Sequence, residues 1–165
     1  MDDRDRLVRI YLQDHLAGSV VALELLERSA RSNGENELGA FLADLRREIV
    51  EDRNTLLDVM RTLGVEPSRA KNGVAWAAEK AGRLKLNGRL LRYSPLSRVL
   101  ELEMLEAGIV GKRSLWTNLE VLDDPRLAGV DLRRLVERAE TQRAAVEEWR
   151  RRAAAALRPR RTPQS

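Results

Sequence analysis

Apolar residues recur along most of the chain at intervals of three and four, the spacing that places side chains on one face of an α-helix. Four long segments show this pattern, at about residues 4–33, 35–63, 95–122 and 131–157. The second has the clearest face, made of Leu38, Phe41, Leu42, Leu45, Ile49, Leu56, Val59, Met60 and Leu63. For the third we assign the core face to Leu96, Val99, Leu100, Ala107, Val110 and Val121. We therefore predict an all-α protein of four helices of similar length.

Residues with strong preferences for helix ends lie at the borders of these segments. Asn33 and Gly34 are expected to end the first helix, because glycine accepts the left-handed conformation that often follows a helix. Ser94 and Pro95 predict an N-cap and the first helical residue of the third helix. Asp131 predicts the N-cap of the fourth. Periodicity and end residues thus indicate the same borders.

The lengths of the connections predict how the helices are arranged. Short connections join the first two helices and the last two, so each pair is expected to be antiparallel. The crossover at 64–94 is long enough to run the length of the bundle, which makes the second and third helices parallel. We expect a short helix at about 74–86 within it, because a structureless connection of this length is unusual. The prediction is an up-down-down-up bundle, a single domain over residues 1–157, with a disordered basic tail at 158–165.

Two antiparallel helix pairs joined by one long crossover form the architecture of the ferritin-like proteins. The strings Tyr11–Ala17, Gly82–Leu90 and Ser94–Glu103 resemble those of uncharacterised bacterial proteins of ferritin-like type. The resemblance implies a di-iron site of inward glutamates and two Glu-x-x-His pairs. The chain has a single histidine, and the Glu-x-x-Glu strings Glu48–Glu51 and Glu137–Glu140 contain none. We therefore expect an intact di-iron centre to be absent.

Several acidic and polar side chains nevertheless fall within the apolar faces. Asp14 and His15 lie on the first helix, Asp52 on the second and Glu103 on the third. A buried carboxylate needs a hydrogen-bond donor, a cation or a metal as its partner. One interpretation is a remodelled metal site formed by these four residues, whose oxygen and imidazole ligands suit Mn, Fe or Zn.

The other interpretation is a polar layer that is paired internally. Gln142 falls within the apolar face of the fourth helix and is expected to be a polar core residue. Arg53 or Lys112 would neutralise the acids, and His15 would donate to a carboxylate. We favour this interpretation, so no cofactor is expected, and Fe, Mn or Zn is the alternative.

The net charge of +4 is unevenly distributed along the chain. Residues 69–92 and 150–161 each carry a net charge of +6, so the remainder carries −8. Such segments can attract nucleic acid or an anionic membrane surface. The candidate anion-binding residues are Arg83, Lys85, Arg89, Arg92, Arg150, Arg151 and Arg152. No apolar run approaches the roughly 20 residues of a membrane span, so we expect no transmembrane segment and a cytoplasmic location.

Three functions remain open at this point. The first is a ferritin-like protein without a di-iron centre that acts as an interaction or structural protein rather than an enzyme. A homodimer through an apolar helix face is expected in that case, because Leu12, Leu16, Val20 and Leu23 extend beyond a single core stripe. The second is a metal-dependent oxidase or hydroxylase, or a metal-binding protein, with the remodelled carboxylate site. The third is a nucleic-acid or anionic-membrane binder that uses the basic crossover and tail.

Overall fold

The computed structural model describes residues 3–67 and 93–158. This part of the chain contains the helices α1 (Asp3–Asn33), α2 (Glu37–Thr62), α4 (Pro95–Leu122) and α5 (Leu132–Ala155), with a short 3₁₀ helix, η1 (Pro125–Leu127). The prediction of an all-α protein with four long helices is confirmed, and each border lies within about two residues of its predicted position. The predicted short helix at 74–86 and the tail at 159–165 lie outside the described residues.

The helix ends form through local side-chain contacts that the sequence indicates. Ser94 accepts a hydrogen bond from the backbone N–H of Ser97 at 3.2 Å, and the two residues form a reciprocal capping box before α4. Asp131 caps α5 in the same manner at 3.0 Å. Gly34 follows α1 with a φ of 59°, the left-handed conformation predicted for it. Asn36 caps α2, which places its start two residues later than predicted.

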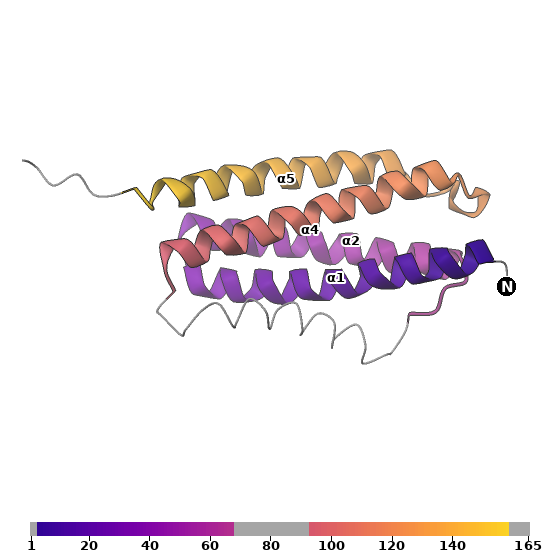
Figure 1. The fold of residues 1–165 in the computed structure, drawn as a ribbon, viewed down its shortest axis with the longest axis horizontal. Helices are drawn as coiled ribbons and strands as arrows, with labels where there is room; N and C mark the ends of the chain where they lie inside the picture. The colour runs from indigo at the N-terminus through magenta and orange to yellow at the C-terminus, as the bar shows by residue number, and fades with distance from the viewer. Residues whose placement is uncertain (1–2, 68–92, 159–165) are drawn as a thin grey trace, which may run out of the picture.

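The four helices lie lengthwise beside one another, α1 against α2 and α4 against α5 (Figure 1). Contacts at both ends of α1 define its direction relative to α4. Arg4 at the start of α1 donates to the carbonyl of Leu122 at the end of α4, at 3.1 Å. Asn33 at the end of α1 accepts a hydrogen bond from Arg98 at the start of α4, at 2.9 Å. α1 is therefore antiparallel to both α2 and α4, and α2 and α4 run in the same direction.

The apolar core consists of two clusters, one toward each end of the bundle. Leu26, Leu42 and Leu105 belong to the cluster near the end of α1. Leu12 and Trp116 belong to the cluster near its start. The clusters are separated at the level of residues 17–24 of α1, 50–55 of α2 and 110–114 of α4. The buried polar residues Asp52 and Gln142 and the pocket described below lie at this level, whereas Ser29 and Asn33 are buried near the end of α1.

The core face of α4 differs from the predicted one. Among the residues assigned to that face, Val99 is buried, whereas Leu96, Leu100, Ala107, Val110 and Val121 are exposed. The core instead receives Leu102, Leu105, Ile109, Leu115, Trp116 and Leu119. The prediction was wrong because α4 carries apolar residues on both sides, so their spacing does not distinguish the inner face from the outer one.

Candidate functional site

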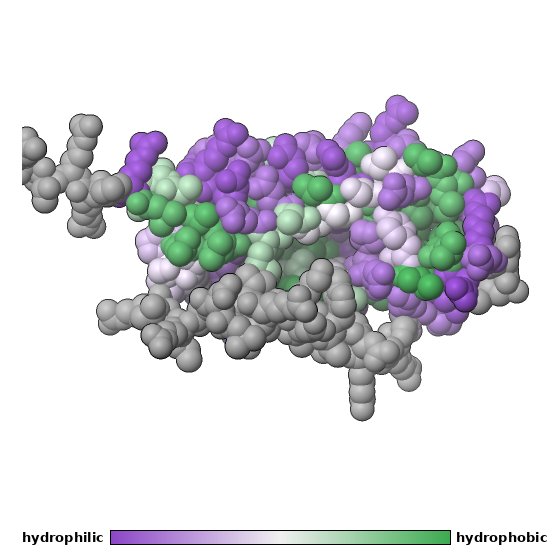
Figure 2. Space-filling view, viewed as in Figure 1, coloured by the Kyte–Doolittle hydropathy of each residue, from purple (hydrophilic) through white to green (hydrophobic). Residues whose placement is uncertain are grey.

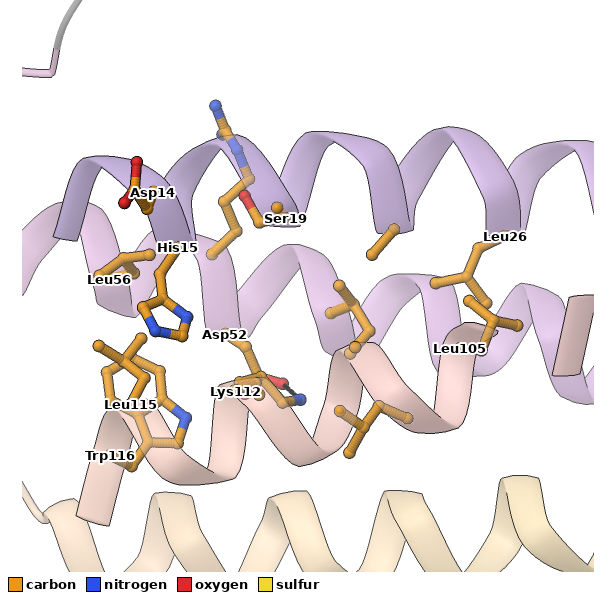
Figure 3. Close-up of a pocket in the computed structure, with 17 residues that line it drawn as sticks. Asp14, His15, Ser19, Leu26, Asp52, Leu56, Leu105, Lys112, Leu115 and Trp116 are labelled. Carbon is orange, nitrogen blue, oxygen red and sulfur yellow. Dashed lines mark hydrogen bonds and ion pairs between the residues drawn. The ribbon is translucent and has the colours of Figure 1, made fainter. Parts of the chain in front are cut away.

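A pocket of about 310 Å³ lies between α1, α2 and α4, in the gap between the two core clusters. Its apolar wall is formed by Leu26, Ile49, Leu56, Leu105, Ile109, Leu115 and Trp116. The polar residues on the wall are Asp14, His15, Ser19, Asp52, Arg53 and Lys112. Figure 3 shows His15 and Trp116 at one end, Leu26 and Leu105 at the other, and Asp52 with Lys112 between them. A recess with apolar side chains at its base is visible near the middle of the face in Figure 2.

Small residues on facing turns of α1 and α4 create this space. Gly18 and Ala22 line the pocket from α1, and Gly108 and Gly111 line it from α4. A methyl group added to any of the three glycines would meet no atom within 4 Å. Glycine inside a helix is less favourable than alanine by about 0.5–1 kcal/mol. The pocket is thus maintained at the expense of helix stability. Glycines inside a helical pattern were the signal that the sequence offered for it.

A buried network of charged and polar side chains lies beside the pocket. The ammonium group of Lys112 donates hydrogen bonds to Asp52 Oδ2 and to Gln142 Oε1. Arg138 Nε lies 3.3 Å from Asp52 Oδ1, and Gln142 Nε2 donates to Glu48 Oε2 at 2.8 Å. Burial lowers the pKa of Lys112, and the charge of Asp52 opposes this shift. Asp52 and Gln142 are both buried and both bonded to Lys112, as the interpretation of an internally paired polar layer expected. The other part of that interpretation, a hydrogen bond from His15 to a carboxylate, is not found among the described residues.

The four residues predicted to form a metal site are not brought together. Asp52 is paired with Lys112, Asp14 is exposed, and Glu103 lies on the exposed outer face of α4. The expectation that Glu103 points into the bundle is wrong, because α4 turns its other face inward. Within residues 3–67 and 93–158, no three side chains of metal-binding type lie close enough together to hold an ion. A Lys ammonium already neutralises the central carboxylate, so these residues do not fit a Mn, Fe or Zn site.

His15 lies on the pocket wall, where its ring packs edge-on against Tyr11 with ring centroids 4.6 Å apart. Burial lowers the pKa of His15 below its ordinary value of 6.5, and the nearby Asp14 carboxylate partly offsets the effect. The imidazole is therefore neutral at pH 7, with one nitrogen as donor and the other as acceptor. No side chain in the described part of the chain forms a hydrogen bond with this ring.

Trp116 is a pocket residue whose role the sequence did not indicate. Its side chain is 1% exposed, and its indole Nε1–H has no hydrogen-bond partner among the described residues. Buried indole N–H groups usually have a partner. This buried indole N–H, on a residue that lines the pocket, is therefore a donor without an acceptor among the described residues.

Some of the predicted anion-binding residues lie in the described part of the chain and the others lie outside it. Arg150, Arg151 and Arg152 lie in the last turns of α5, and each pairs with a glutamate, at 2.8, 2.5 and 2.9 Å respectively. Their charges are thus balanced locally. Those outside the described residues are Arg83, Lys85, Arg89 and Arg92.

A comparison of the chain with protein-family models, with curated proteins and with solved structures finds no match. None of the helices in the described ranges is long and apolar enough to cross a membrane. The geometry and chemistry of the pocket are therefore the guide to function.

Proposed function

We propose that this protein is a ferritin-like bundle without a metal centre that binds a small, largely apolar molecule between α1, α2 and α4. The pocket itself carries the proposal, because it has a volume of about 310 Å³ and is walled mainly by leucine, isoleucine and glycine. Ligand sites of helix bundles commonly lie between the helices. An apolar cavity of about 150 Å³ is already large enough to hold benzene. None of the three functions considered from the sequence includes a site for a small apolar molecule, so this proposal comes from the pocket alone.

The directions of the helices support the ferritin-like part of the proposal. α2 and α4 run in the same direction, as the up-down-down-up arrangement requires, and the crossover at 64–94 joins them in the sequence. The centre of a ferritin-like bundle is where inward carboxylates hold metal ions. Here the central carboxylate of Asp52 is paired with Lys112, and apolar space lies beside the pair. A site for an apolar molecule in place of a metal centre is consistent with both features.

A cavity-filling variant with a matched control tests the proposal. Gly108→Leu places a side chain in the pocket, whereas Ala155→Leu places a leucine at an exposed position of α5 outside the pocket. The probe is α-methylstyrene, a neutral aromatic hydrocarbon, titrated into the full chain while backbone amide signals of pocket residues are followed by NMR. We expect saturable shifts in the unmodified chain and in Ala155→Leu, and none in Gly108→Leu. Absence of saturable binding to the unmodified chain overturns the proposal.

Self-association through the outer face of α4 is a second candidate function. The exposed residues of this face include Leu96, Leu100, Val110 and Val121, with Leu100 44% and Val121 79% exposed. Together with Glu103, Ala107, Ser114 and Thr117 they repeat at alternating intervals of four and three residues, the spacing of a coiled-coil seam, although three of these four residues are polar. The homodimer expected from the sequence was assigned to Leu12, Leu16, Val20 and Leu23 of the first helix. Leu12 and Leu16 are buried in the core, so the outer face of α4 is a different surface from the one expected.

A further inference from the structure

We propose that the molecule bound in the pocket carries an uncharged hydrogen-bond acceptor, such as a ketone oxygen, and that Trp116 binds this acceptor. The inference rests on the proposed function and names the ligand class: small neutral molecules with an apolar body and an acceptor at one end. The acceptor binds at the end of the pocket formed by His15 and Trp116. The apolar body extends toward Leu26 and Leu105 at the other end (Figure 3).

The unpaired indole N–H of Trp116 is the main evidence for the acceptor. An indole nitrogen can only donate, and a buried donor without an acceptor destabilises the folded protein. Trp116 lines the pocket, and Figure 3 shows its indole nitrogen on the side of the ring that faces Lys112. The nitrogen itself has almost no accessible surface, so a ligand in the pocket supplies the missing acceptor when the indole ring shifts toward the cavity.

The other polar groups of the pocket wall do not supply an acceptor for the indole N–H. The Lys112 ammonium and the Asp52 carboxylate are bonded to each other, and the Ser19 hydroxyl donates to the Leu16 carbonyl at 2.6 Å. His15 lies at the same end of the pocket as Trp116 (Figure 3), and its ring makes no hydrogen bond with the described residues. His15 thus offers a second hydrogen-bonding group next to the indole.

The charges around the pocket favour a neutral ligand over an anion. The charge of Lys112 is balanced by Asp52, and His15 is uncharged at pH 7 because burial lowers its pKa. The remaining charged groups of the wall, Arg53 and Asp14, are of opposite sign, so the charges on the wall sum to zero. A carboxylate bound next to the buried indole would lose its hydration and leave the pocket with a net negative charge. A carbonyl oxygen loses much less hydration free energy when it is buried.

Two probes of nearly the same shape test the inference on the full chain. Acetophenone and α-methylstyrene differ only in a carbonyl oxygen that replaces a methylene group. We expect acetophenone to bind about tenfold more tightly, because it alone accepts the indole hydrogen bond. The indole N–H signal of Trp116 is expected to move downfield in ¹H–¹⁵N spectra with acetophenone only. The signals of the three tryptophans are assigned by substituting Trp76 and Trp149 with phenylalanine.

The variant Trp116→Phe removes the donor and should abolish the preference for acetophenone while α-methylstyrene still binds. Trp149→Phe is the matched control, because Trp149 packs on Phe41 outside the pocket and its loss should leave the preference intact. If Trp116→Phe does not fold, the indole shift in the unmodified chain decides the question.

The remaining outcomes distinguish this inference from the proposed function. Equal affinities for the two probes, without an indole shift, overturn the inference and leave the proposed function standing. Absence of binding by both probes overturns the proposed function itself. Tighter binding of benzoate than of acetophenone overturns the assignment of a neutral ligand.

Discussion

Lys112 on α4 donates a hydrogen bond to the buried carboxylate of Asp52 on α2, and this contact joins the two helix pairs at the middle of the bundle. The same ammonium group also donates to Gln142 on α5. One side chain thus holds three helices at a common level. α1 takes no part in this network and contributes instead to the wall of the pocket.

Removal of the Lys112 ammonium should strongly destabilise the protein. In Lys112→Met, the Asp52 carboxylate remains buried with Arg138 as its nearby cation, and we expect a loss of about 3 kcal/mol in the free energy of unfolding. Urea unfolding measures the loss. The control is Arg113→Met, since Arg113 and Glu140 form a surface pair 3.0 Å apart with side chains 44% and 43% exposed. That change should lower the stability by less than about 1 kcal/mol, and equal effects would contradict the role assigned to Lys112.

His15 should make the stability depend on pH. Burial lowers its pKa in the folded protein, so the unfolded chain takes up the proton first as the pH falls. The contribution of His15 to the free energy of unfolding is therefore at its full value above the pKa of the unfolded chain, about 6.5. It decreases as the pH drops toward the lower pKa of the folded protein. Urea unfolding at about pH 7.5 and pH 5.5 measures how much stability each protein loses on acidification. We expect a smaller loss in His15→Gln than in the unmodified chain. Titration of the carboxylates contributes equally to both proteins, so the difference reports on His15. The chain has one histidine, so an identical loss in both would refute the prediction.

Asn33 should be important for the contact between the end of α1 and the start of α4. Its buried amide donates to the Tyr93 hydroxyl at 2.7 Å and accepts from Arg98 at 2.9 Å. Asn33→Ala removes both hydrogen bonds, although the Tyr93 hydroxyl keeps its bond to Glu101 at 3.2 Å, and we expect a loss of about 2 kcal/mol in the free energy of unfolding, measured by thermal or urea unfolding. Asn118→Ala removes an exposed hydrogen bond to Tyr11 and should have an effect of about 0.5 kcal/mol or less. A similar loss in both variants would argue against a special role for Asn33.

The outer face of α4 should determine the mass of the protein in solution. If two copies pair through this face, sedimentation equilibrium gives a mass above the 18.7 kDa of one chain. Leu100→Glu places a charge on the seam and should return the mass to that of the monomer. Asn54→Glu adds a charge on an exposed position of α2 and should leave the mass unchanged. An unmodified chain that stays monomeric at high concentration excludes this surface as a dimer interface.

The helices and their ends are predictable because both depend on residues that are close in the sequence. Ser94 and Asp131 cap their helices through the backbone three residues further on, so the local sequence is sufficient. The orientation of α4 is not local, because leucines occur at 96 and 100 on one side and at 102 and 105 on the other. Packing against α1 and α5 selects the inner side, and periodicity does not contain that information.

The candidate site was predictable only where a residue conflicts with its surroundings. Asp52 and Gln142 stand out as polar residues within clean apolar faces, and both are buried. Glu103 shared this signal but belongs to the outer face of α4, so the predicted cluster does not form. Gly108 and Trp116 line the pocket because α4 packs against α1. The two helices are distant in the sequence, so local patterns do not predict this contact.

The way α1 is attached to α4 determines how a molecule can enter the pocket. Arg4 and Asn33 fasten the two ends of α1, whereas Gly18 and Ala22 leave its middle without packing against α4. A helix held at both ends can bow outward at its centre while both attachments stay intact. Hydrogen exchange should therefore be faster at amides 17–22 than at 25–29, and a bound ligand should slow it. This local breathing of one helix would widen the recess seen in Figure 2, with the other three helices remaining in place.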